Sequence, residues 1–201
     1  MHREAVCEAL HATMARAETQ IDLAKASLLV SQLDNEEVDV EAYLRDLERH
    51  AEEIRAKLPQ AADAAARLAA LNKYLFQENG YHGSRNDYYH RSNSYLNEVL
   101  DDREGLPITL SVLYMELAQR IGVDVKGVGL PGHFIVKFTP AEGPAQLIDV
   151  YEGGKPLSTG DAKARVNEFT GLPWKDSYLE AVSKQEIVVR MIHNLMGLAR
   201  E

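Results

Sequence analysis

The sequence predicts an α+β fold in which helices precede a small antiparallel sheet. Apolar residues recur every three or four positions through the first third of the chain, as they do along one side of a helix. A long apolar segment then begins at Pro107, and short strand candidates separated by Pro, Gly and acidic residues follow between residues 125 and 151. We therefore expect an N-terminal helical bundle packed on a core that contains the sheet.

The composition is that of a globular protein, and it limits the classes of partner. The chain has 201 residues, of which 45% are hydrophobic, enough for a single core. The net charge of −9 argues against binding to nucleic acid or to an anionic membrane. Cys7 is the single cysteine, which excludes an intrachain disulfide and a cysteine-based zinc site. No membrane-length apolar stretch or signal-peptide pattern is present, so we expect a cytoplasmic protein without a cofactor.

Several helices are expected before residue 80. The predicted ranges are 21–33, 40–58 and 61–77, and Cys7 lies in a further helix before them. Asp39 is a typical N-cap residue for the second range, which carries one apolar stripe and ends at Pro59. Gly80 marks the end of the third.

The sequence changes character over residues 81–93, which predict a loop rich in tyrosine, histidine and arginine. A short helix over 94–100 and a charged turn follow. His82, Asp87 and His90 carry groups that can bind a metal ion, but their spacing is not typical of metal ligands. We therefore predict no metal site here, and the tyrosines either pack the loop or line a groove.

From Pro107 to Gly122 the sequence has few polar residues and predicts a helix covered on most sides. Proline is favoured at a first helical position because the N–H that it lacks would have no partner there. Strand candidates cover residues 125–128, 133–138 and 146–151, and further helices cover 161–169 and about 184–200. Ser183 and Glu186 form a capping box that opens the last helix.

The last helix carries apolar residues over more of its circumference than one core-facing stripe needs. We expect Val188, Ile192 and Leu195 to pack on the rest of the chain and the other apolar positions to stay uncovered. An uncovered apolar patch typically meets a partner. This predicts association through the helix, as a homodimer or with a separate helical protein. The alternative is that the N-terminal helices cover both of its sides.

Pro107, His133 and Asp149 follow one another in the order of a Cys-His-Asp acyl-transfer site. In such a site a helix N-terminus lowers the pKa of the thiol, the His takes its proton, and the Asp orients the His. Adjacent strands would bring His133 and Asp149 together. Pro107 stands where the thiol belongs and offers no nucleophile. Thr109 and Ser111 are the nearest hydroxyls, although such side chains commonly bond their own helix backbone.

Two blocks of sequence, residues 93–111 and 127–134, carry a family resemblance. They read Asn-Ser-Tyr-Leu-Asn-Glu-Val-Leu through Gly-Leu-Pro-Ile-Thr-Leu-Ser, and Gly-Val-Gly-Leu-Pro-Gly-His-Phe. From about Ile21 to Met196 the chain resembles the SirB-type family, which has a transglutaminase-like (papain-like) core, followed in longer members by tetratricopeptide-like helices. Bacterial members are associated with regulation of invasion genes, and related modules occur in eukaryotic F-box proteins.

The resemblance implies a division of the chain and roles for particular residues. Its regions would be an N-terminal helical region (1–80), the transglutaminase-like core (81–180) and a C-terminal helix (181–201), in one compact unit. His133 would match the catalytic His, Asp149 the third member of the triad, and Pro107 the missing Cys. Transglutaminase or cysteine-protease activity is therefore not expected.

Two functions of different classes remain open. The first is a non-catalytic module, binding or regulatory, whose cleft recognises a protein partner. Its groove candidates are Tyr88, Tyr89, Arg91, Asn93, Tyr95 and Asn97. The second is a hydrolase or acyl-transferase in which His133 and Asp149 act with a water, Thr109, Ser111 or a metal. A purely structural domain is the third alternative, and a nucleophile or metal beside the His133 ring would distinguish the first two.

Overall fold

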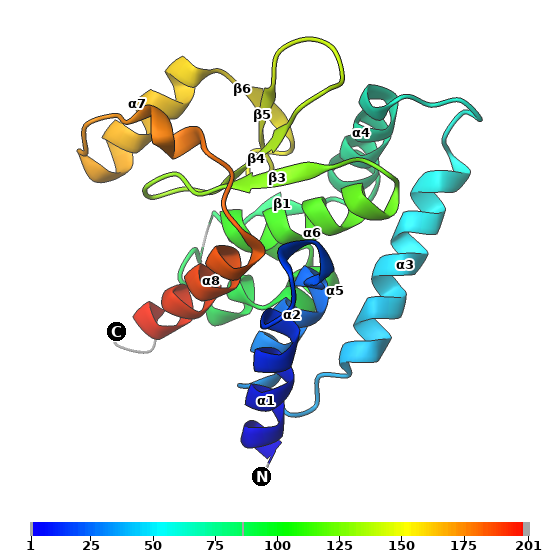
Figure 1. Ribbon diagram of the computed structural model, residues 1–201, viewed down its shortest axis with the longest axis vertical. Helices are drawn as coiled ribbons and strands as arrows, with labels where there is room; N and C mark the ends of the chain where they lie inside the picture. The colour runs from blue at the N-terminus through cyan, green and yellow to red at the C-terminus, as the bar shows by residue number, and fades with distance from the viewer. Residues whose placement is uncertain (1, 86, 199–201) are drawn as a thin grey trace.

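A computed structural model describes residues 2–85 and 87–198 (Figure 1). The helices are α1 (His2–Met14), α2 (Leu23–Gln32), α3 (Val40–Ala56), α4 (Ala64–Asn72), α5 (Leu96–Asp102), α6 (Pro107–Arg120), α7 (Thr159–Thr170) and α8 (Lys184–Leu198). The strands are β1 (His82–Gly83), β2 (Glu104–Gly105), β3 (Val125–Val128), β4 (Ile135–Phe138), β5 (Gln146–Asp149) and β6 (Lys155–Leu157). The predicted α+β class is confirmed. The expected extension of the last helix to Arg200 lies outside the described residues.

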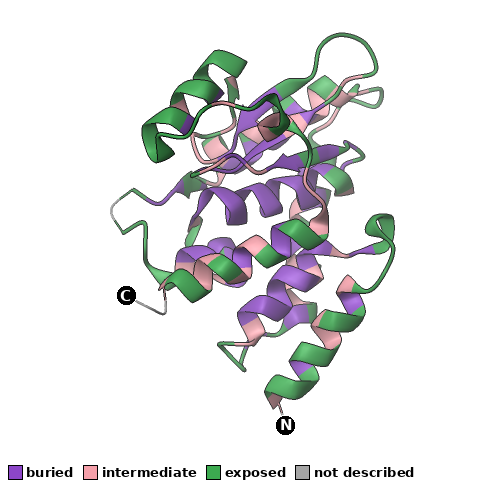
Figure 2. Cartoon of the chain, turned by 60° about the vertical axis from the view of Figure 1, so that its left-hand side comes forward, coloured by how far each residue is buried: buried purple, intermediate pink, exposed green. Residues whose placement is uncertain are grey.

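Helix α6 lies at the centre of the molecule, and every residue from Pro107 to Ala118 is buried. It contacts α2, α3, α4, α5 and α8 as well as strands β3 and β4. Buried residues gather around it, whereas the outer helices are exposed on their solvent side (Figure 2). Arg67 donates a hydrogen bond of 2.7 Å to the Ile121 carbonyl, and Arg55 donates to the Arg120 carbonyl. Guanidinium groups thus satisfy the C-terminal carbonyls of α6.

The main sheet is antiparallel, with the strand order β3-β4-β5-β6. Val136 of β4 pairs with Ile148 of β5, and both join the core around α6. Ile135 and Leu147 point to the opposite face and pack against Ala162 and Val166 of α7, together with other residues. The sheet therefore lies between α6 and α7 because successive side chains alternate between its two faces.

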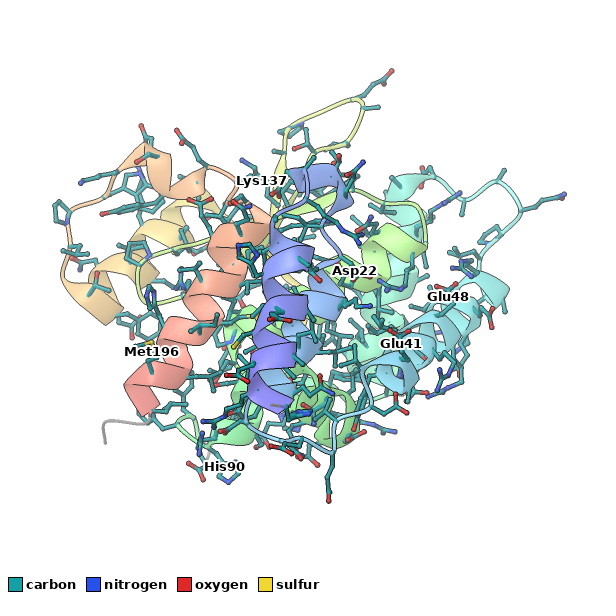
Figure 3. All side chains as sticks on the ribbon, turned by 60° about the horizontal axis from the view of Figure 1, so that its bottom comes forward. Asp22, Glu41, Glu48, His90, Lys137 and Met196 are labelled. Atoms are coloured by element: carbon teal, nitrogen blue, oxygen red, sulfur yellow. The ribbon has the colours of Figure 1, made fainter. Side chains whose placement is uncertain are left out.

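Helix α8 lies beside the N-terminal helix α1 (Figure 3) and contacts α2 and α6. Its Ile187, Val188 and Met191 are buried, whereas Ile192 and Leu195 are partly buried at the margin of the core. The expectation that the apolar positions other than Val188, Ile192 and Leu195 stay uncovered is therefore wrong for Ile187 and Met191, because α8 packs on α2 and α6. Val189 and Met196 are about half exposed. The N-terminal helices therefore cover part of α8, and its association with a partner stays a prediction.

Side-chain caps set several helix starts as the sequence predicted. Asp39 accepts the Ala42 N–H at 2.9 Å and opens α3. Ser183 and Glu186 form the expected capping box before α8. None of the helices in the described residues is long and apolar enough to span a membrane.

Some boundaries differ from the prediction. The helix expected over residues 61–77 begins only at Ala64, because Asp63 caps it, and its last turn, Lys73–Glu78, is a π-helix. The strand expected from His133 begins at Ile135, because Gly132 adopts φ +75° and forms a turn. Strand β6 and the two-residue parallel pair of β1 and β2 were not anticipated. They are too short to produce an alternating pattern.

A glycine of β1 allows the ring of Tyr151 to reach its place beside the sheet. A Cβ atom at position 83 would lie 2.4 Å from the Tyr151 ring. The ring has little room to retreat because its hydroxyl donates a hydrogen bond to the Ser84 carbonyl.

We expect Gly83→Ala to lower the free energy of unfolding by about 2 kcal/mol through overpacking. Urea denaturation measures this change. At the matched position Gly160, the nearest atom to an added Cβ is 3.5 Å away, so Gly160→Ala should change stability by less than about 0.5 kcal/mol. Equal stability of the two variants would contradict the packing described for Tyr151.

Candidate functional site

His133 and Asp149 form a buried pair at neighbouring ends of β4 and β5. His133 lies in the turn that precedes β4, and Asp149 is the last residue of β5. The distance from His133 Nε2 to Asp149 Oδ2 is 2.9 Å. Only 5% of His133 and none of Asp149 is exposed. When Nε2 donates this hydrogen bond, the neutral ring keeps Nδ1 as an acceptor.

Arg165 of α7 shares the carboxylate with His133, and sequence reasoning did not anticipate it. Its Nη1 lies 2.9 Å from Asp149 Oδ2 and 3.5 Å from His133 Nε2. The second carboxylate oxygen, Oδ1, accepts the Glu152 N–H at 3.1 Å. From the end of β5, Asp149 therefore binds the turn after that strand, the turn before β4, and α7.

The pKa of Asp149 reflects this environment. Burial by itself raises the pKa of the carboxyl group, but the hydrogen bond from His133 and the electrostatic attraction of His133 and Arg165 outweigh burial. The Glu152 N–H acts in the same direction, so the pKa of Asp149 lies below its usual value. The carboxylate is therefore ionised at neutral pH.

Pro107 and His133 line the same cleft, which has a volume of about 320 Å³. Pro107 is the first residue of α6, where no side chain caps the helix. The other residues that line the cleft are Tyr88, Leu106, Ile108, Gly132, Phe134, Arg190 and Asn194. Larger hollows lie around the C-terminal half of α6 and beside the end of α8, and neither Pro107 nor His133 borders those of them that the described residues form.

A continuous row of aromatic rings runs past His133. The ring of Tyr89 contacts Tyr88, Tyr88 contacts Tyr151, and Tyr151 contacts His133 at a centroid distance of 6.0 Å. The ring of His133 also lies 6.2 Å from the ring of Phe169. Tyr89 and Phe169, at the two ends, are 67% and 56% exposed. We call these five residues the aromatic row.

The other predicted groove residues do not line this cleft. Arg91 and Tyr95 both bind Asp34, on a separate groove beside the end of α8. Asn93 is buried and donates to the Asp87 carbonyl at 2.8 Å, whereas the buried Asn97 donates to Glu98. Of the six predicted groove residues, Tyr88 alone lines the cleft. Tyr89 does not line it, but its ring contacts the ring of Tyr88.

The hydroxyls that were considered as nucleophiles lie inside the protein. Thr109 and Ser111 are fully buried in α6, and their oxygens have no hydrogen-bond partner within the described residues. Neither residue lines the cleft. Cys7 is exposed on α1.

The loop histidines belong to different local contacts. His90 Nδ1 lies 2.6 Å from the Ser92 hydroxyl, and His82 Nδ1 lies 3.2 Å from the Gly83 carbonyl. Figure 3 shows His90 at the edge of the molecule. In the part of the chain that is described, no group of three metal-binding side chains comes together.

Comparison of the sequence with known protein families gives a further result. Residues 41–193 match the family described as the transglutaminase-like superfamily, so the chain belongs to this superfamily. The narrower assignment to the SirB-type family stays a prediction. No solved structure matches the chain significantly.

Curated relatives of two kinds are similar to the chain. A UPF0162 protein of Xylella fastidiosa is 32% identical over 180 residues, which cover 87% of this chain and 64% of the relative. A UPF0162 protein of Pseudomonas aeruginosa is 29% identical over 77% of this chain and 56% of its own length. F-box only protein 21 of Homo sapiens is 29% identical over 66% of this chain and 22% of its own. The chain thus spans less than two thirds of the length of these relatives.

The Asp149 carboxylate should stabilise the folded protein at neutral pH and lose this effect at acidic pH. Asp149→Asn leaves Arg165 without its counter-ion, and we expect the free energy of unfolding to fall by about 3 kcal/mol at pH 7. Because the pKa of Asp149 is lower in the folded state, its contribution is present above the unfolded-state pKa of about 4 and is lost as the pH falls through the folded-state value. Urea denaturation between pH 7 and pH 3 measures the difference. A difference that grows toward low pH would contradict this account.

Placing a thiol at position 107 tests whether Pro107 stands at the nucleophile position. In a Cys7→Ser background, we expect Pro107→Cys to fold and its thiol to react with iodoacetamide about tenfold faster at pH 7 than Cys7 of the parent chain. The reason is that a helix N-terminus and a nearby imidazole both favour the thiolate. Mass spectrometry measures the rate. Alkylation no faster than that of a free cysteine peptide would contradict the correspondence.

Proposed function

We propose that the chain is a non-catalytic transglutaminase-like module that binds a partner protein in the cleft beside His133. The observation that carries the proposal is the position of Pro107, which opens α6 at the cleft where a thiol acyl-transfer site has its nucleophile. Proline supplies neither a nucleophilic atom nor an N–H group. The surrounding His and Asp remain, but the atom that would attack a substrate does not.

The aromatic row supports recognition of a polypeptide. Tyr89 and Phe169 expose more than half of their surface at its two ends. Exposed aromatic side chains bring large contact area at a small entropic cost and are enriched at protein interfaces. The row would accept apolar groups of a partner on either side of His133, while the polar cleft accepts a smaller group.

The contacts of Asp149 also favour a structural role over a catalytic one. In a thiol acyl-transfer site, the carboxylate stabilises the imidazolium that forms when His takes a proton. Here the same oxygen already pairs with Arg165 at 2.9 Å. That oxygen is therefore shared between the ring and the guanidinium and is not reserved for the ring. The pair is therefore better suited to hold the sheet on α7 than to move protons.

A hydrolase or acyl-transferase is the second candidate, and one observation favours it. His133 Nδ1 has no hydrogen-bond partner among the described residues, and His133 lines the cleft. A neutral imidazole with a free acceptor can take a proton from a water molecule. Thr109 and Ser111 would first have to leave their buried positions, so water is the better nucleophile in this alternative.

The cellular setting is part of the same proposal. We place the module in the cytoplasm, where a chain with a single cysteine needs no disulfide, and assign it a regulatory role through its partner. The division at residues 80 and 180 stays a prediction, since one hydrophobic core includes residues of all three ranges. Association through α8 is a further proposal that light scattering can test.

Cross-linking from the aromatic row tests the binding function. A photoreactive phenylalanine analogue placed at Tyr89 or at Phe169 should cross-link the same partner protein in cells, because both residues flank the cleft. The same analogue at Glu52, an exposed residue of α3, should not capture it. Mass spectrometry identifies the partner.

An activity assay separates the two candidate functions. We expect purified protein to release no ammonia from a glutaminyl peptide and to cleave no peptide bond. Turnover that disappears in His133→Ala would support the hydrolase or acyl-transferase instead. Different captured proteins at Tyr89 and Phe169, or equal capture at Glu52, would refute the proposed binding site.

A further inference from the structure

The cleft contains an arginine, Arg190, that has no acidic partner among the described residues. Arg190 of α8 is partly buried, and its guanidinium carbon lies 5.5 Å from the centre of the Phe134 ring. Its Nη2 donates to the Leu130 carbonyl at 3.0 Å and to the His133 carbonyl at 2.8 Å. Within the described residues, no carboxylate forms an ion pair with it. Burial lowers the pKa of Arg190, yet an arginine stays charged at neutral pH.

Part of the guanidinium remains available to a ligand. The two hydrogen bonds to carbonyls use Nη2, so the N–H groups on Nε and Nη1 have no partner among the described residues. A partly buried cation is costly unless an opposite charge approaches it. The bonds to the carbonyls fix the orientation of the guanidinium, and this lowers the entropic cost of binding.

The rest of the cleft also offers donors to a negative group. Leu106, at the N-cap of α6, provides no side-chain cap, so the first N–H groups and the positive end of the helix dipole lie at the cleft. Asn194, one turn after Arg190, brings an amide, and His133 keeps Nδ1 unpaired among the described residues. Among the described residues that line the cleft, none is acidic. This is notable in a chain of net charge −9.

We propose that the cleft binds a carboxylate group of the partner polypeptide, held by Arg190 and the N-terminal end of α6. The inference rests on the proposed function of the cleft and names the chemical group that it recognises. A planar carboxylate matches the fork of guanidinium donors. The single full positive charge balances one negative charge, whereas phosphate recognition by proteins typically uses clusters of arginines.

Three small probes test whether the cleft recognises the negative charge or the rest of the peptide. N-acetylglutamate N-methylamide carries a side-chain carboxylate, N-acetylglutamine carries a terminal carboxylate, and N-acetylglutamine N-methylamide carries none. We expect one or both acids to shift the NMR signals of the Ile108 and Gly132 amides and of Arg190 Nε–H with saturation, and the neutral amide to leave them in place. The acid with the stronger effect shows which source of carboxylate the cleft prefers.

A new negative charge in the cleft gives a variant that keeps Arg190 and its bonds to the carbonyls. Asn194→Asp should weaken binding of the acid by about tenfold or more, because like charges in a cleft repel. The matched control Asn167→Asp makes the same substitution on the exposed side of α7 and should bind as the parent does. Dispersion of the amide signals reports that both variants are folded.

Any other outcome overturns the inference, and the results also show whether the proposed function of the cleft fails with it. Equal shifts with the neutral amide would reject carboxylate recognition and leave the cleft as a peptide site. Shifts from none of the probes would also reject it, while the cross-linking test still decides the proposed function. Unchanged binding of the acid to Asn194→Asp would reject the proposed site, because the anion would then bind away from α8.

Discussion

Burial of twelve consecutive residues of α6, from Pro107 to Ala118, constrains most of the structure. A helix covered on every side needs partners in all directions, and helices of the first 102 residues, the sheet and α8 provide them. Glu116 is the single acidic side chain in that stretch, and it pairs with Arg120 one turn later. Since the interior is close-packed, a shift of α6 would disturb each of these layers.

The fixed position of α6 determines where the cleft forms. Its first turn faces the turn before β4, and α8 completes the cleft with Arg190 and Asn194. Guanidinium groups satisfy the C-terminal carbonyls of the helix, whereas its N-terminus has no side-chain cap. The free N–H groups at the start of α6 therefore lie at the cleft, whereas the carbonyls at its other end are already paired. The surface there is rich in donors although the protein as a whole is acidic.

The order of elements, the central helix and the meeting of His133 with Asp149 follow from local patterns in the sequence. Apolar spacing predicts α2 and α3, and neighbouring strands bring the two side chains together. Arg165, Arg190 and the ring of Phe169 could not be anticipated, because they come from α7 and α8 and meet His133 across 32 or more residues. Arg91 and Tyr95 appeared to belong to the cleft because they are near Tyr88 in sequence. The backbone instead turns them toward Asp34.

The multiple contacts of Asp149 make the buried pair part of the fold. The carboxylate binds His133, Arg165 and the Glu152 N–H while fully buried, so the fold depends on both members of the pair whatever residue stands at the start of α6. A His and an Asp that meet in this way therefore say little by themselves about activity, and the residue that opens the central helix is the more informative one.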